Sequence, residues 1–159
     1  MDTKTPEERS RNMAKIRSGN TKPEKLVRSM LFRLGYRFRL KTKILPGHPD
    51  IVLPGRKIAV FVHGCFWHSH TGCSKATIPS SNRTFWEAKL KRNRERDILT
   101  KDEILKKGWR VLWVWECSLR TVKMREGLSL KIRDFIEGED TFGEISGRDF
   151  QINPPKMRI

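Results

Sequence analysis

Apolar residues recur at helical spacing in three parts of the chain, and each part predicts a helix. The first predicted helix covers 23–34, where Pro23 suits a helix start and Gly35 suits a stop. The second is a long, strongly charged helix over 84–107, and the third covers 128–136.

Short apolar or alternating runs between these helices predict strands. The predicted strands are 36–40, 50–53, 57–62 and 109–116. The order helix, three strands, helix, strand, helix predicts an α/β fold, with a mixed β-sheet flanked by helices. We expect one domain over 1–159, with a basic N-terminal arm at 1–20 and a poorly patterned tail at 138–159.

The charge of the chain predicts a polyanionic partner. The sequence has 34 Lys and Arg against 18 Asp and Glu, which gives a net charge of +16. Residues 1–43 hold thirteen basic and four acidic residues, a net of +9, whereas 121–159 hold seven of each. A basic face concentrated in one half of the chain favours nucleic acid.

Other bulk properties predict a cytoplasmic protein. The start of the chain is charged rather than apolar, and no apolar run is long enough to cross a membrane. The three cysteines are an odd number, so metal ligation fits better than a framework of disulfides.

The richest chemistry lies in residues 63–73, which contain three histidines and two cysteines around Phe66 and Trp67. His70 and Cys73 are separated by two residues, a spacing at which a short loop can present both side chains to one ion. A structural zinc ion needs four ligands, and Cys117, after the last predicted strand, offers a further thiolate.

Several motifs in order resemble the very-short-patch repair endonucleases of the restriction-endonuclease-like superfamily. They are Arg9-Ser-Arg-Asn-Met13, Leu45-Pro-Gly-His-Pro-Asp50, Phe61-Val-His-Gly-Cys-Phe-Trp-His68, Phe85-Trp86, Asn93 to Asp97, and Gly108-Trp-Arg-Val-Leu-Trp-Val-Trp-Glu-Cys117. The resemblance implies a restriction-endonuclease-like core with a structural zinc site. It also implies a bacterial, nucleoid-associated enzyme that nicks DNA beside the thymine of a T·G mismatch, and mismatch-repair proteins as possible partners.

The resemblance also assigns a catalytic set. Asp50 matches a magnesium ligand, and the main-chain carbonyl of Val62 would be a second ligand, although relatives have threonine at that position. Glu24 matches a glutamate that holds a metal-bound water, but it could equally be a charge that stabilises a helix N-terminus. His68 matches the catalytic base, and His63 could contact the phosphate or protonate the leaving group.

The zinc ligands implied by the resemblance are His70, Cys73, Asp97 and Cys117. Relatives can have a histidine run where this chain has a rearranged loop at 69–72, and Cys65 is interpreted as a small buried residue.

Four apolar side chains match residues that wedge into the base stack beside the mismatch: Met13, Phe66, Trp67 and Trp86. Three alternatives stay open. They are a nuclease of the same fold with another specificity, such as a restriction or defence enzyme, a zinc-bearing DNA-binding module without catalysis, and an RNA-binding protein.

Overall fold

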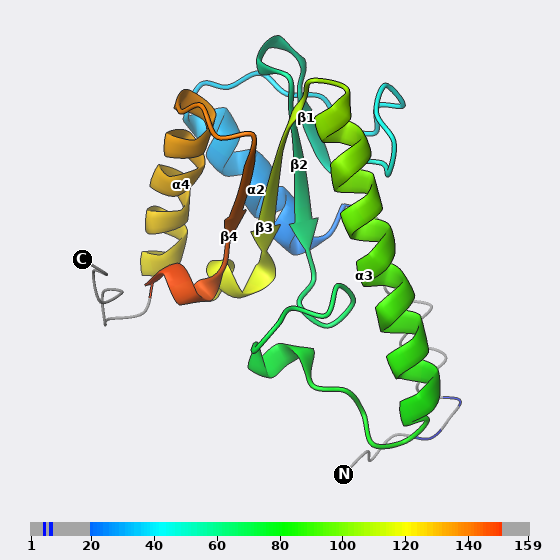
Figure 1. Cartoon of the computed structure of the whole chain (residues 1–159). Coiled ribbons are helices and arrows are strands. Elements are labelled where there is room, and N and C mark those ends of the chain that lie inside the picture. Colours follow the sequence, from blue (N-terminus) through cyan, green and yellow to red (C-terminus); the bar gives the residue numbers. More distant parts are fainter. Residues whose placement is uncertain (1–4, 6, 8–19, 151–159) are drawn as a thin grey trace, which may run out of the picture.

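The computed structural model describes residues 5, 7 and 20–150 of the chain. They form a four-stranded sheet between two helical layers (Figure 1). The elements are α2 (Lys22–Arg33), β1 (Ile51–Leu53), β2 (Ile58–His63), α3 (Arg83–Lys106), β3 (Arg110–Trp115), α4 (Val122–Glu137) and β4 (Phe142–Ile145). None of the helices in the described part of the chain is long and apolar enough to cross a membrane.

The sheet has the strand order β1-β2-β3-β4 and is mixed. β1 runs antiparallel to β2, whereas β2, β3 and β4 are parallel to one another. The parallel strands end on the same edge of the sheet, so His63 pairs with Trp115 there. The predicted α/β class and the mixed sheet flanked by helices are confirmed.

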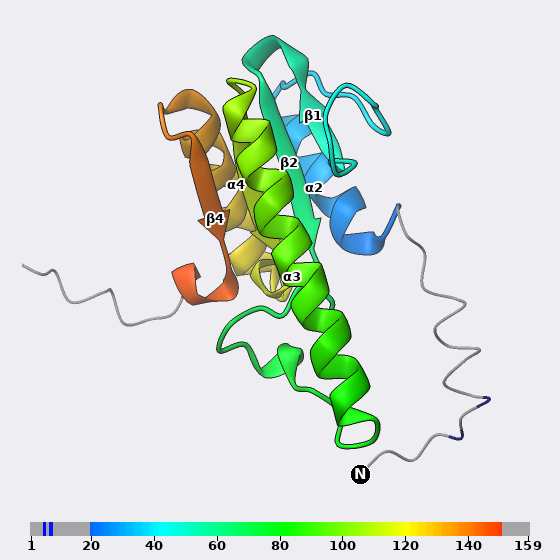
Figure 2. The same cartoon turned by 45° about the vertical axis from the view of Figure 1, so that its right-hand side comes forward.

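Side chains of the central strands alternate between two buried faces, as the pleat of a strand requires. Ile58 and Val60 of β2 pack in the core that α2 and α4 cover. Ala59 and Phe61 point to the other face, where they join Ile104 of α3. Figure 2 shows α3 lying across one face of the sheet, with α2 and α4 behind it. Burial on both faces fits the nearly continuous apolar run of β2.

The predicted secondary structure differs from the structure in three places. Residues 36–40 form only one isolated bridge, Arg39 with Val52, instead of a strand. The last helix begins at Val122, capped by the Thr121 hydroxyl that accepts from Met124 N at 3.1 Å. β4 lies within 138–159, the segment interpreted as poorly patterned. Its four residues sit at the sheet edge and only Ile145 is buried, so this strand has almost no apolar pattern.

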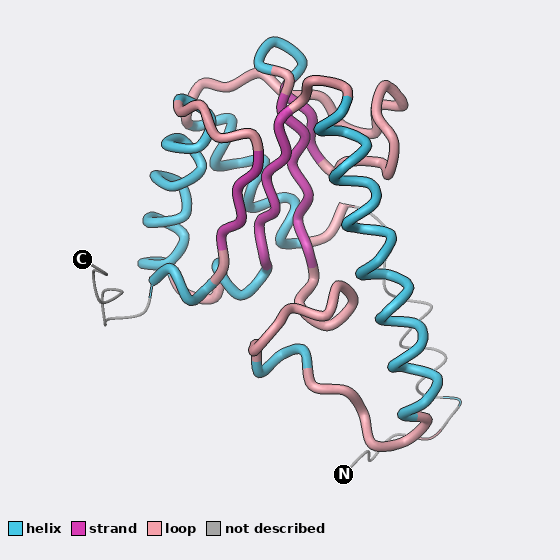
Figure 3. The backbone as a smooth tube through the Cα atoms, in the orientation of Figure 1, coloured by secondary structure: helices cyan, strands magenta, loops and turns pink. Residues whose placement is uncertain are grey.

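Helix α3 extends well past the sheet. Its 24 residues span about 36 Å, whereas the six residues of β2 span only about 20 Å. The loop at 64–82 connects the two elements along this extension, with a single short helical turn at Ser74–Ala76 (Figure 3). The functional residues described next lie where this loop leaves the sheet.

Candidate active site and metal cluster

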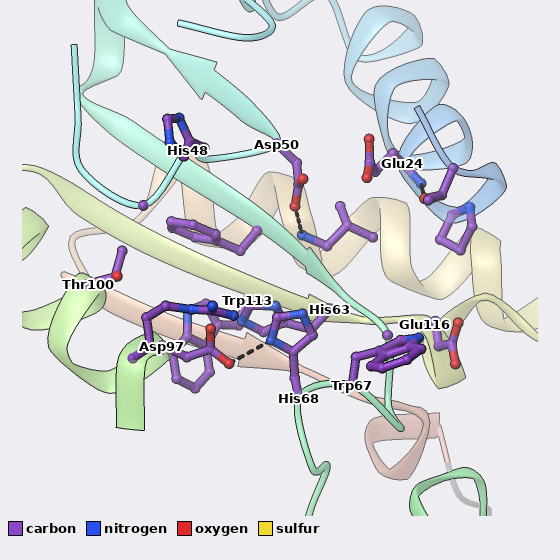
Figure 4. A pocket seen from close by; sticks show the side chains of 17 residues that line it. Glu24, His48, Asp50, His63, Trp67, His68, Asp97, Thr100, Trp113 and Glu116 are labelled. Carbon is purple, nitrogen blue, oxygen red and sulfur yellow. Dashed lines mark hydrogen bonds and ion pairs between the residues drawn. The ribbon is translucent and has the colours of Figure 1, made fainter. Parts of the chain in front are cut away.

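A cavity of about 700 Å³ lies at the end of β2, between α2, α3 and the 64–82 loop. Its lining includes seven of the predicted site residues: Glu24, Asp50, Val62, His63, Trp67, His68 and Asp97. Figure 4 shows the cavity and labels all of these except Val62. Trp113, Thr100 and Glu116 also line it, and the sequence analysis did not single them out for this role. The structure therefore brings together residues from three separate parts of the chain.

Asp50 directly precedes β1 and faces the end of the antiparallel partner strand. The Val62 backbone N–H donates to its Oδ2 atom at 2.7 Å. Burial raises the pKa of Asp50 to about 7, the Val62 N–H opposes this shift, and the charge of Glu24 adds to it. Ionisation of Asp50 is costly in this buried position, and a bound cation would stabilise the ionised carboxylate.

Glu24 is buried, with 5% of its surface exposed, and lies on the same cavity. Its Oε2 atom accepts from the Asn20 N–H at 2.8 Å and pairs with Nη2 of Arg28 at 3.2 Å. Its own N–H is capped by the Thr21 hydroxyl at 3.4 Å. Glu24 thus stabilises the start of α2, as the second interpretation expected, while its carboxylate also borders the cavity that contains Asp50.

His63, His68 and Asp97 form a compact group on one wall of the cavity. The His63 and His68 rings stack with centroids 4.0 Å apart, and Nδ1 of His68 lies 2.6 Å from Oδ2 of Asp97. Burial of His63, which is 3% exposed, holds its pKa well below the usual range. Its Nε2 atom has no hydrogen-bond partner in the described part of the chain.

A second cluster lies on the other side of the same loop, and its members differ from the four expected zinc ligands. Ligand atoms of Cys65, His70, Cys73 and Cys117 all lie within 4.8 Å of one another. Asp97, expected as the fourth ligand, instead lies with His63 and His68. Cys65, interpreted from the sequence as a small buried residue, takes its place in the cluster.

The backbone at Ser69 explains how neighbouring histidines serve different clusters. Ser69 has a φ of +51°, in the left-handed region that reverses the chain direction. His68 therefore meets Asp97, whereas His70 stacks on Trp115 with ring centroids 4.1 Å apart and lies 3.6 Å from the Cys117 sulfur.

The sulfur-rich cluster has the chemistry of a metal centre. A hydrogen bond from the Cys65 thiol lowers the pKa of Cys117 to about 5, and the Gly147 N–H donates to the same sulfur at 3.2 Å. A thiolate in a mostly buried group of three cysteines and one histidine is a ligand set for a transition metal. The cluster could therefore hold one ion.

The predicted aromatic residues also come together. Ring centroids of Phe66, Trp67 and Trp86 lie 5.1 to 5.8 Å from one another, and Lys89 Nζ lies 5.5 Å from the Trp67 ring. This group joins the loop to the projecting end of α3. The predicted contact residue Met13 lies outside the described residues.

The turn before Asp50 packs closely against α3. Gly47 has a φ of +76°, and a Cβ atom there would overlap Cγ2 of Thr100. Thr100 lies one helical turn after Asp97, so this contact joins the segment that ends in Asp50 to the helix that carries Asp97. Both Gly47 and Thr100 line the cavity.

Comparison with known proteins identifies relatives over most of the chain. A family model described as DNA mismatch endonuclease Vsr matches residues 1–75. The type II nicking enzyme V.XorIIP of Xanthomonas oryzae is 47% identical over 133 residues, which cover 84% of this chain and 97% of the relative. V.NmeAIP, a type II nicking enzyme of Neisseria meningitidis, is 47% identical over 134 residues, covering 84% of this chain and 95% of that enzyme. The DNA mismatch endonuclease Vsr of Escherichia coli is 38% identical over 139 residues, covering 86% and 88% of the two chains.

Proposed function

Since the chain belongs to the DNA mismatch endonuclease Vsr family, we propose that it nicks one strand of duplex DNA beside the thymine of a T·G mismatch. Membership makes the chain a nuclease that acts on DNA, and the names of two similar enzymes add that they are nicking enzymes. The T·G substrate, the restriction-endonuclease-like classification and the single-domain organisation belong to the proposal. One observation carries it: Asp50, His63 and His68 share a cavity beside a group of large aromatic rings.

Asp50 would hold a magnesium ion together with the carbonyl of Val62, and Glu24 would hold one of the waters around it. The residues fit such an ion because two carboxyl groups border one cavity, where burial and then the charge of Glu24 raise the pKa of Asp50. Bound magnesium would supply positive charge close to the phosphate on which negative charge develops. If only the main-chain carbonyl binds the ion, valine would serve at this position as well as threonine.

His68 would remove the proton from the attacking water. When its Nδ1–H donates to Asp97, the lone pair of the neutral ring is on Nε2 and can accept a proton. Asp97 would then fix the tautomer and the orientation of the ring, as a carboxylate does beside a catalytic histidine. His63, packed against His68, would contact the phosphate or protonate the leaving oxygen.

The cluster of Cys65, His70, Cys73 and Cys117 would hold a structural zinc ion. Its four protein ligands leave no open position, and three sulfurs with one imidazole nitrogen suit zinc. Since Cys65 begins the loop that carries His68, the ion would hold the proposed base in place. Such a zinc ion would contribute to catalysis only by positioning His68.

Recognition would use the ring group and the basic surface in different ways. Phe66, Trp67 and Trp86 would insert between bases, where the cost of unstacking is lowest beside a weakly stacked mismatch. The excess of Lys and Arg, +16 overall, would bind phosphates without regard to sequence.

Nicking of labelled T·G and T·A duplexes in magnesium buffer tests this proposal. The wild-type chain should cut the T·G strand preferentially, and Asp50→Ala should abolish cutting while DNA affinity stays near normal. Equal cutting of both duplexes would indicate a nuclease of another specificity, and binding without cutting would indicate a DNA-binding module. Near-normal cutting by Asp50→Ala would reject the assignment of that residue.

A further inference from the structure

We propose that His63, His68 and Asp97 form a second transition-metal site, and that an ion bound there stops nicking. Their ligand atoms all lie within 4.8 Å of one another, in a group separate from the sulfur-rich cluster. Two imidazoles and one carboxylate are a set that zinc, cobalt and similar ions use when other positions stay open. The inhibition rests on the proposed role of His68, whereas the binding of the ion does not.

His63 gives an independent reason to expect a ligand. It is 3% exposed, it lies between His68, Trp113 and Trp115 with ring centroids 4.0 to 5.1 Å away, and its Nε2 atom has no hydrogen-bond partner among the described residues. Buried polar atoms normally have a hydrogen-bond partner. A buried nitrogen without a partner, within a cluster of ligand atoms, therefore indicates a place where an ion binds. Figure 4 shows this histidine beside His68 and Asp97.

The contact between His68 and Asp97 can open to admit an ion with little movement. Their Nδ1 and Oδ2 atoms are 2.6 Å apart, so Nδ1 donates to the carboxylate when it carries the ring proton. Two ligand atoms on a tetrahedral zinc ion are about 3.3 Å apart, given bonds of about 2.0–2.1 Å, so the pair must separate by less than about 1 Å. The ion takes the place of the proton on Nδ1 of His68, and this proton moves through water to Nε2 of the same ring, so the imidazole stays neutral.

This exchange would remove the base. A neutral imidazole that binds a metal through Nδ1 carries its remaining proton on Nε2, which then has no lone pair for a proton from water. The ion that stops the reaction would therefore belong to the imidazole-binding class, not to magnesium, which prefers oxygen ligands. Nicking would fall as this class of ion rises at a constant magnesium concentration.

Cobalt is a suitable probe because its visible absorption reports its ligands. We would titrate cobalt into the full chain after zinc has filled the sulfur-rich cluster, with magnesium in large excess to occupy the proposed Asp50 site, and count bound cobalt by equilibrium dialysis. We expect one additional ion per chain at the His63–His68–Asp97 group, without the thiolate charge-transfer band that cobalt in the sulfur-rich cluster would give.

Two variants locate the ion. Asp97→Asn keeps an oxygen beside His68 but loses the negative charge, so we expect cobalt affinity to fall at least tenfold. Asp102→Asn removes an exposed carboxylate from the same helix and should leave cobalt affinity unchanged. His63→Gln, checked for folding by its thermal transition, should weaken binding as Asp97→Asn does.

The outcomes separate the two halves of the proposal. A wild-type chain that binds no additional cobalt, or an Asp97→Asn variant with unchanged affinity, would overturn the site. If the site fills but T·G nicking continues at its full rate in magnesium, the inhibition is refuted. Lost nicking that returns when cobalt is dialysed away would support it. A chain that never nicks a T·G duplex would refute the proposed function, and the cobalt titration would still decide the site.

Discussion

The Oδ2 atom of Asp97 lies 2.6 Å from Nδ1 of His68, so a side chain of helix α3 contacts a histidine of the 64–82 loop. This contact joins two segments that are 29 residues apart in sequence. The contact fixes Nδ1 of His68 toward the helix and leaves Nε2 available to accept a proton. A carboxylate in this relation to a histidine usually orients the ring rather than takes part in bond making.

Removal of either partner should therefore slow nicking to different extents. We expect His68→Ala to lower the single-turnover rate on a T·G duplex by about 10²–10⁴, the usual range for a lost acid–base group. Asp97→Ala should lose less, because it removes only the orienting partner. Asp102→Ala, on the exposed side of the same helix, serves as the control. A normal rate for His68→Ala would remove that residue from the mechanism.

The raised pKa of Asp50 predicts a pH-dependent cost to stability. Its carboxyl group ionises near pH 4 in the unfolded chain but only at about 7 in the folded one, so the folded state binds more protons between these values. The stability of the wild type should fall relative to Asp50→Asn as the pH rises from 4 to 7, and the difference should stay constant above that. Denaturant unfolding of both proteins in magnesium-free buffer measures it. A difference that does not change with pH would contradict the burial of the charge.

The metal cluster predicts which cysteine variants lose zinc. If the proposed zinc is present, thiol-modifying reagents should release it from the wild type, whereas Cys65→Ser should contain none. The unfolding free energy of Cys65→Ser should fall by more than about 2 kcal/mol, because loss of a structural metal is among the costly changes. Asp97→Asn should keep this zinc. The opposite result, zinc kept by Cys65→Ser and lost by Asp97→Asn, would restore the ligand set expected from the sequence.

The ring group predicts a loss of discrimination rather than of affinity. We expect the triple replacement of Phe66, Trp67 and Trp86 by alanine to lower the ratio of T·G to T·A nicking, because the unstacking advantage of the mismatch is lost. Binding of matched DNA should change little and should still weaken steeply with salt. Phe32→Ala is a control, since this side chain is 76% exposed and does not line the cavity. An unchanged ratio would make the three rings ordinary packing residues.

The close approach of Gly47 to Thr100 predicts a compensating pair of substitutions. Gly47→Ala places a Cβ against Cγ2 of Thr100 and also strains a positive φ, so we expect about a tenfold loss of the nicking rate and about 1 kcal/mol or more of stability. Thr100→Ser removes Cγ2 and should restore part of the rate in the double variant. Gly55→Ala is a matched control, since nothing lies within 4 Å of its added Cβ. No recovery in the double variant would show that the contact does not set the rate.

Much of the fold could be predicted because the core strands have a strong local pattern. The apolar run of β2 and the helical spacing of α2 depend only on neighbours in the sequence. β4 could not be predicted, because a four-residue edge strand with one buried side chain has almost no pattern of its own. Its place is set by pairing with β3, which is a long-range property.

The ligand sets depended on geometry that spacing does not encode. His68 and His70 are close in sequence, and only the reversal at Ser69 sends them to different clusters. Asp97 was predicted to bind a metal ion together with His70, whereas its carboxylate contacts His68. The odd number of cysteines already favoured metal ligation, and Cys65 could have been weighed as a ligand on that ground, since thiolates suit ions such as zinc.

The direction in which the 64–73 loop is anchored has a consequence for how the enzyme is made. The loop is tied to Asn93, Glu116, Cys117 and Arg148, all of which follow it in the sequence. When His68 has just emerged from the ribosome, the residues that hold its loop in position have therefore not yet been synthesised. The cell would receive its nuclease activity only after synthesis has passed Arg148, and prematurely terminated chains that end before Cys117 would be unable to cut DNA.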